Sequence, residues 1–176
     1  ELLKQSQQCL LRDWETKDLA DLSDTIQYLH NKKTFAIVQN NWEFLTEPEF
    51  NKVQLLGNND IDLRNRIDMV RNYQYDLDNS DLGWYYGRCA WIIRHAFYND
   101  IITEEEAWSL LEENGKYIRQ HFTSWESFGL SYLVGSQYWK LENYSESAMK
   151  LAKKNITYLL TNRNSPWLNI NWNDFE

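Results

Sequence analysis

Apolar residues recur at intervals of three and four along almost the whole chain, which is the spacing of one face of a helix. Helical spacing covers residues 1–56 and 60–75, and continues over 82–98, 103–121, 125–140 and 145–161. No segment shows a convincing strand pattern, in which apolar and polar residues alternate. The pattern therefore predicts an all-α fold of about seven to eight helices joined by short loops.

The segment 82–98 carries apolar residues on almost every face, which is typical of a helix at the centre of a domain. Two arginines, Arg88 and Arg94, interrupt it. A buried guanidinium without a partner is strongly unfavourable, so each arginine predicts a carboxylate nearby. Glu106 and Glu126 are the candidates, because they stand in the first turns of the two helices that follow. An anion or substrate site at the arginines is the alternative.

Residues with capping side chains mark the expected helix starts. Thr16 is expected to cap the helix that follows it, and Ser145 opens the last long helix. Ser/Thr-x-x-Glu capping boxes stand at residues 103–106 and 123–126. Capping explains the glutamate of each box, and a role as general acid or base is the alternative for either.

The helix 125–140 combines a broad aromatic face with two glycines, Gly129 and Gly135. Each glycine costs roughly 1 kcal/mol in a helix interior, so a close contact should offset it. The close approach of another helix is the expected contact, and helix 82–98 is the expected neighbour. A ligand pressed against the backbone is the alternative.

The chain is long enough to bury a core of its own, and we expect a single all-helical domain over residues 1–176. It comprises an N-terminal helical layer, a set of core helices and a tail, at residues 1–56, 60–164 and 165–176 respectively. The tail carries large apolar residues such as Trp167, which predicts that it packs back on the body.

The formal net charge is −8 at pH 7, from 18 basic and 26 acidic residues. This balance argues against binding to nucleic acid, which needs clustered Lys and Arg. No apolar run approaches the roughly 20 residues that span a bilayer, so no membrane partner is expected. An acidic surface favours solubility, and it also suits a basic protein partner.

The two cysteines, Cys9 and Cys89, fit no metal-ligand spacing. Two buried free thiols are favoured over a disulfide, which indicates a reducing compartment such as a cytoplasm. The chain begins at Glu1 rather than Met, so a removed signal peptide stays open as an alternative.

Searches for catalytic and cofactor motifs are negative, so we expect no cofactor and no metal. His30, His95 and His121 stand on three different predicted helices, and we expect each to be solvated or satisfied in the core. The Asp-rich segments 60–62 and 76–80 lack the glycine and the closing glutamate of a calcium loop.

Five segments carry a resemblance to a known family. They are Gly87-Arg88 with Arg94, residues 101–108, residues 124–135 with Trp139, residues 12–14, and residues 165–167. Together they resemble the bacterial domain-of-unknown-function 1266 family over most of the chain. The resemblance implies an all-helical bacterial protein and brings no established reaction. The family pattern has an acidic residue three positions before the arginine matched by Arg88, where this chain has Tyr85.

We therefore expect a non-enzymatic protein that binds another protein through its acidic surface. Most concretely, it would be an immunity protein that covers the active site of a basic toxin, for example a nuclease. The expected contacts are exposed acidic side chains, namely Asp18, Asp21, Asp24, Glu112 and Glu113.

The alternative is an enzyme or small-anion-binding protein whose site lies between helix 82–98 and helix 125–140. Such a site needs cations for the anion, an acid or base, and an aromatic wall. The residues that would supply these groups are Arg88, Arg94, Glu106, Glu126, Trp125 and Tyr132. An oligomer joined through the aromatic tail is a third possibility.

Overall fold

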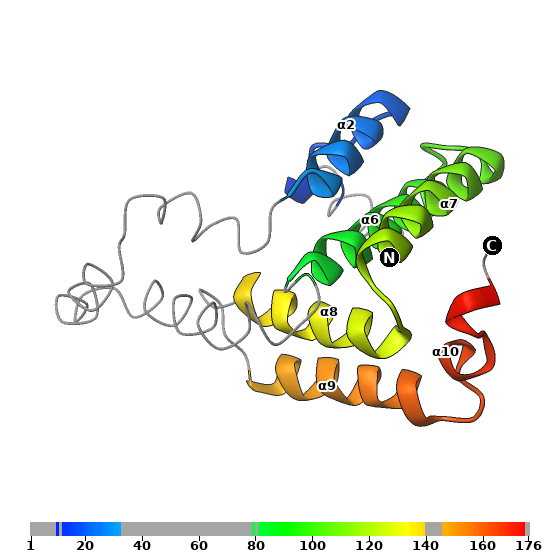
Figure 1. Ribbon diagram of the computed structural model, residues 1–176. Coiled ribbons are helices and arrows are strands. Elements are labelled where there is room, and N and C mark those ends of the chain that lie inside the picture. Colours follow the sequence, from blue (N-terminus) through cyan, green and yellow to red (C-terminus); the bar gives the residue numbers. More distant parts are fainter. Residues whose placement is uncertain (1–9, 11, 33–78, 80, 140–145, 175–176) are drawn as a thin grey trace, which may run out of the picture. The chain divides into compact units, whose positions relative to one another are not determined.

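The computed structural model describes residues 10, 12–32, 79, 81–139 and 146–174. Every regular element in these residues is helical, which confirms the predicted all-α class (Figure 1). The elements are α2 (Leu19–His30), α6 (Leu82–Tyr98), α7 (Glu104–His121), α8 (Trp125–Trp139), α9 (Glu146–Thr161), α10 (Pro166–Asn169) and the short 3-10 helix η2 (Trp172–Asp174). The helical spacing predicted within 33–78 lies outside the described residues.

The chain divides into two compact units, and each is considered by itself. The first, which we call the α2–α7 unit, is formed by Glu1–Lys32 and Tyr85–His121. The second, the α8–α10 unit, is formed by Lys33–Trp84 and Phe122–Glu176. The single domain predicted over residues 1–176 stays a prediction. Residues 57–59, which separate the predicted N-terminal layer from the predicted core helices, lie outside the described residues.

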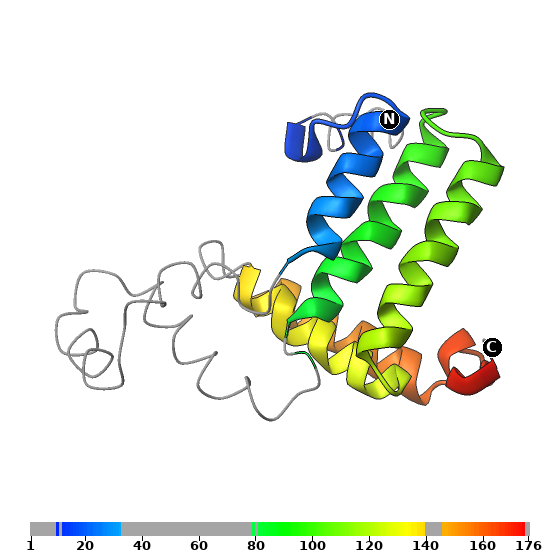
Figure 2. The same ribbon diagram turned by 45° about the horizontal axis from the view of Figure 1, so that its top comes forward.

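In the α2–α7 unit, the helices α2, α6 and α7 lie side by side (Figure 2). The predicted central role of α6 is confirmed, because this helix buries apolar side chains along its whole length. The buried residues of α6 in this unit are Tyr85, Tyr86, Cys89, Ile92, Ile93 and Ala96. The facing side of α2 contributes Leu22, Ile26 and Leu29 at the spacing of an amphipathic helix.

In the α8–α10 unit, the first turn of α6 crosses α8 at a contact made possible by small residues. The backbone N–H of Gly83 donates to Ser131 Oγ at 2.9 Å. A Cβ added to Gly83 would lie 2.8 Å from Phe128 O, and one added to Gly135 would lie 2.4 Å from Trp84 Cβ. The predicted close approach of helix 82–98 to helix 125–140 is therefore confirmed within this unit.

The C-terminal tail packs on α8, as the sequence predicts. Ser165 caps α10 by accepting from Trp167 N–H, and its own hydroxyl donates to Leu159 O at 2.6 Å. The Trp167 ring stacks on Trp125 at 5.1 Å, and it lies 3.0 Å from the position a Cβ would take at Gly129. Gly129 thus makes room for an indole ring of the tail.

Two of the predicted helix caps are wrong by one or two residues. Thr16 is not the N-cap of α2. Its hydroxyl donates to Trp14 O and its N–H donates to Leu10 O, so both groups bind the C-terminal end of the helical residues that precede it. Asp18 is the N-cap of α2, because its carboxylate accepts from Asp21 N–H at 2.9 Å. A carboxylate at this position also interacts favourably with the helix dipole.

The second capping box is shifted from 123–126 to 124–127. Ser124 Oγ accepts from Ser127 N–H at 3.0 Å, while Ser127 Oγ accepts from Ser124 N–H at 3.3 Å. Ser127 therefore takes the place that Glu126 was expected to fill. The box at 103–106 is as predicted, since Thr103 N–H donates to Glu106 at 2.7 Å and Thr103 Oγ1 accepts from Glu106 N–H.

Candidate functional site

The acidic side chains of the α2–α7 unit fall into two groups, those with structural partners and those without. Asp18 caps α2, and Asp21 accepts from Lys17 N–H at 3.1 Å. Asp24, Glu112 and Glu113 form no hydrogen bond or ion pair with any described residue. All five were predicted to contact a partner, and the last three are the ones whose carboxylates are not already used by the fold.

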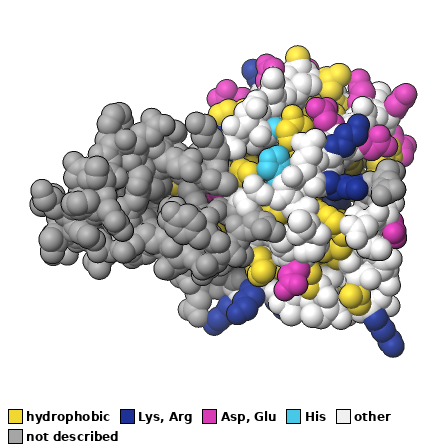
Figure 3. Space-filling view, in the orientation of Figure 1, with side chains coloured by type: hydrophobic (Ala, Val, Ile, Leu, Met, Phe, Trp, Pro, Cys, Tyr) yellow, Lys and Arg dark blue, Asp and Glu magenta, His cyan; other side chains and the backbone are white. Residues whose placement is uncertain are grey.

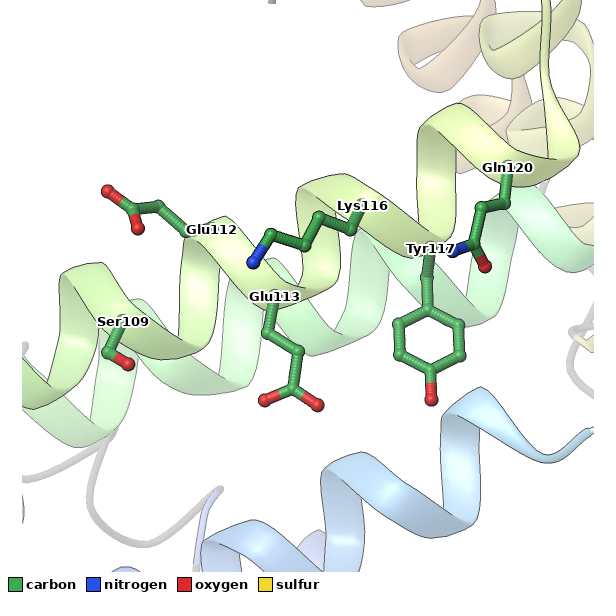
Figure 4. Close-up of a pocket in the computed structure, with 6 residues that line it drawn as sticks. All are labelled: Ser109, Glu112, Glu113, Lys116, Tyr117 and Gln120. Atoms are coloured by element: carbon green, nitrogen blue, oxygen red, sulfur yellow. The ribbon is translucent and has the colours of Figure 1, made fainter. Parts of the chain in front are cut away.

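Glu112 and Glu113 both line an open depression on α7 with a volume of about 480 Å³. The full lining is Ser109, Glu112, Glu113, Lys116, Tyr117 and Gln120. Figure 4 shows Glu113 and Tyr117 pointing toward α2, whereas Glu112 points away from it. Every lining side chain carries a polar group, so the depression is unlike the mostly apolar pockets that enclose small molecules.

Acidic side chains dominate this part of the surface. In Figure 3 they gather over the region formed by α2 and α7. The acids of the two helices are Asp21 and Asp24 on α2 and Glu104, Glu105, Glu106, Glu112 and Glu113 on α7. The basic residues of the same helices, Lys116 and Arg119, both stand in the second half of α7. The first half of α7 is thus uniformly negative.

Next to the depression, and sharing Tyr117 with it, lies a polar cluster, which we define as His30, Tyr86, Asn114, Tyr117 and His121. The first three are buried, and Tyr117 and His121 are half-buried. His30 Nε2 lies 2.9 Å from Asn114 Oδ1, and Asn114 Nδ2 donates to the backbone oxygen of Tyr86 at 3.1 Å. The His30 ring stacks on Tyr117 with ring centres 3.9 Å apart. His121 Nδ1 donates to Tyr117 O at 2.8 Å and lies 3.3 Å from the Tyr86 hydroxyl. The cluster ties α2, α6 and α7 together.

Burial perturbs the ionisable groups of this cluster. Desolvation lowers the pKa of His30 below 6.5, against the smaller opposing effects of the Asn114 hydrogen bond and the Glu113 charge. Burial also raises the pKa of Tyr86 to about 12 and that of the neighbouring Cys89 thiol to about 12. At neutral pH all three groups are therefore uncharged. Cys89 is free and buried, as predicted, whereas Cys9 lies outside the described residues.

The residues of the alternative anion site are divided between the two units. Arg88 and Arg94 belong to the α2–α7 unit. The Arg88 guanidinium lies 5.3 Å from the centre of the Trp91 ring, whereas the Arg94 side chain is exposed. An exposed arginine needs no buried carboxylate, so the burial assumed for Arg94 is wrong, and its carboxylate partner stays a prediction. The Glu106 carboxylate accepts from Thr103, and these hydrogen bonds lower its pKa.

The remaining members of that alternative site lie in the α8–α10 unit. Trp125 stacks on Trp167 and donates its indole N–H to Ile170 O at 2.9 Å. Tyr132 lies 5.2 Å from the Trp84 ring, and Glu126 is exposed. Trp125 and Tyr132 therefore contact other aromatic side chains. The enzymatic role of these residues stays a prediction.

The described residues hold neither a metal-ligand cluster nor a helix that could span a membrane. These residues contain no group of three or more His, Cys, Asp or Glu placed to hold a metal ion. Within the same part of the chain, none of the helices has the length and apolarity required to cross a bilayer.

The sequence does not reveal the contact between His30 and Asn114, which are separated by 84 positions. His30 was expected to be solvated or satisfied in the core, and the second reading is correct for it and for His121. One signal was present in the sequence. His30 follows Leu22, Ile26 and Leu29 on the apolar face of its helix, and a polar residue on such a face needs a buried partner.

The described residues define the class of protein: it is all-helical, and it has an acidic helical surface and a polar cluster that joins three helices. Comparison with family models then matches residues 9–172 to "Protein of unknown function (DUF1266)". The chain therefore belongs to the DUF1266 family, and the resemblance seen in the sequence is confirmed. No curated protein and no solved structure matches it.

Proposed function

We propose that this protein is a non-enzymatic protein-binding module, and most concretely an immunity protein that neutralises a basic toxin by direct binding. The observation that carries the proposal is the pair Glu112 and Glu113. Both line an open depression on α7, and neither is used in a hydrogen bond or ion pair with a described residue. Carboxylates left without partners on a negative surface are suited to receive Lys or Arg side chains.

Exposed aromatic side chains on the same two helices support this reading. Trp108 of α7 is 60% exposed and Tyr28 of α2 is 59% exposed. Each has one polar neighbour on its own helix or just beyond it, namely Glu104 for Trp108 and Lys32 for Tyr28. Trp and Tyr contribute more than their share of binding energy in protein interfaces. Charge would steer a partner to this surface, and the two rings would hold it there.

The depression has the chemistry to receive a guanidinium group. Glu112 and Glu113 offer acceptors for its N–H groups, and the Tyr117 ring offers a π face. A toxin that acts on a polyanion presents Lys and Arg around its active site, so a module bound there would exclude the substrate.

The proposal is tested by capture of a partner and by rescue from its toxicity. The full chain carrying an affinity tag would be purified from the source cells, and each captured protein would be expressed alone and together with it. We expect a basic protein that stops growth alone and is neutralised by the wild-type chain. Glu112→Lys with Glu113→Lys should weaken binding by at least about tenfold and abolish rescue.

The control reverses one exposed acid of the other unit, Glu126→Lys. It should leave binding and rescue intact. A partner that binds without being toxic would refute the immunity role and leave protein binding standing. If no partner is retained at micromolar concentration, or if Glu126→Lys is as harmful as the α7 variant, the proposed surface is wrong.

A further inference from the structure

The contact between His30 and Asn114 joins three helices through a single titratable side chain. His30 is 8% exposed at the C-terminal end of α2, and Asn114 is 2% exposed in the middle of α7. Through Asn114 Nδ2 the same contact reaches the backbone of α6 at Tyr86. Of the cluster, the proposed binding function uses only Tyr117, so the contact between His30 and Asn114 calls for an explanation of its own.

The hydrogen bonds define the protonation state that fits the cluster. Asn114 Nδ2 donates to the Tyr86 carbonyl, so Asn114 Oδ1 faces His30 and must accept. His30 Nε2 therefore carries the proton of the neutral ring. A second proton would go to Nδ1, which makes no hydrogen bond with any described residue.

We propose that the His30–Asn114 contact is a proton-operated latch, which holds α2 against α6 and α7 while His30 is neutral and releases α2 when His30 is protonated. A charged imidazolium in this place is buried, and Asn114 offers it only a neutral acceptor. Exposure to water restores its solvation, and α2 must move away from α7 for that to happen. The latch does not depend on the proposed partner.

The groups around His30 decide the pH at which the latch opens. Those that face it are Tyr86 of α6 and Glu113, Asn114, Tyr117 and His121 of α7. Glu113 favours the charged ring and His121 disfavours it, while burial has the largest effect and also disfavours it. Because the pKa of His30 is lowered in the folded unit, the unfolded chain binds the proton more readily. Stability is then full above about pH 6.5 and decreases as the pH falls below it.

The test combines NMR titration of the histidine rings with hydrogen exchange of the α2 amides in the full chain. The His30 ring should titrate below 6.5, and its signal is assigned by its loss in His30→Gln. The opening equilibrium of α2, taken from protection factors, should rise by up to about tenfold per pH unit below that point. In His30→Gln, which retains a donor for Asn114, this pH dependence should disappear.

Two surface variants keep the test valid if His30→Gln does not fold. Glu113→Gln removes the carboxylate that faces His30, so the ring should titrate at lower pH, and the opening of α2 should keep rising to a lower pH before it levels off. Glu112→Gln makes the same change at a side chain that points away from α2 (Figure 4). It should have a smaller effect on the His30 titration and on the opening of α2. Three results would each overturn the latch. They are a His30 pKa at or above 6.5, protection of the α2 amides that does not depend on pH, and equal shifts of the His30 titration in Glu113→Gln and Glu112→Gln.

Discussion

Glycine residues inside helices mark the tightest contact of the α8–α10 unit. At Gly135 an added Cβ would meet Trp84 Cβ at 2.4 Å and Asp81 O at 2.7 Å. The first of these atoms is fixed at the base of its side chain and the second belongs to the backbone, so neither moves by a simple rotation. In contrast, a Cβ at Gly115 of α7 would meet nothing within 4 Å.

This contrast predicts opposite effects of the same substitution. Gly135→Ala should lower the free energy of unfolding by about 1–3 kcal/mol, because α8 must shift away from the first turn of α6. Gly115→Ala should raise it by roughly 1 kcal/mol, since alanine favours the helix and has room. Urea denaturation of both variants checks this, and a loss of stability in Gly115→Ala comparable with that in Gly135→Ala would contradict it.

At the scale of single residues, the sequence predicts burial better than it predicts partners. Gly129 and Gly135 stand out because glycine is unfavourable in a helix, and both contacts exist. Gly83 sits at a helix start, where glycine needs no explanation, so its contact with α8 gives no signal in the sequence. The partner of His30 is equally hidden, because a long-range hydrogen bond leaves no periodic pattern.

At the scale of helices, the prediction agrees with the helices and with both ends of α6, but it misplaces the caps of α2 and α8. The bounds of α6, Leu82–Tyr98, are those predicted, because Tyr98 is followed by a turn in which Asp100 has a φ of 57°. Caps are harder to place, since several Ser, Thr and Asp residues compete at each start. Of two neighbouring candidates, Thr123 and Ser124, local geometry selects the second, and no pattern in the sequence distinguishes them.

The shifted capping box gives the second prediction. Ser124→Ala removes the acceptor for Ser127 N–H and should reduce the free energy of unfolding by about 1 kcal/mol. Glu126→Gln should change it by less than about 0.5 kcal/mol, because Glu126 is exposed and makes no capping bond. Thermal unfolding of the two variants distinguishes the boxes: a larger loss in Glu126→Gln would restore the box at 123–126.

At the scale of the whole molecule, negative charge is distributed unevenly. α2 and α7 together carry seven acids against Lys116 and Arg119, whereas α9 carries Lys150, Lys153 and Lys154 and only one acid, Glu146. The total of −8 follows from composition, whereas the acidic surface that α2 and α7 share becomes visible only when the two helices are seen in one unit. Composition therefore suits a basic partner, and the surface of α2 and α7 is the docking site that we propose for it.

The third prediction concerns the rate at which the proposed partner associates. If the acidic surface of α2 and α7 steers it, the association rate constant should fall by roughly tenfold or more as NaCl rises from about 20 to about 500 mM, because salt screens the charges. Glu112→Gln with Glu113→Gln should lower the rate at low salt and flatten its salt dependence. Glu126→Gln with Asp174→Asn removes the same charge from the α8–α10 unit and should change both much less. Stopped-flow mixing with the captured partner measures these rates, and equal effects of the two double variants would show that net charge, rather than this surface, directs the encounter.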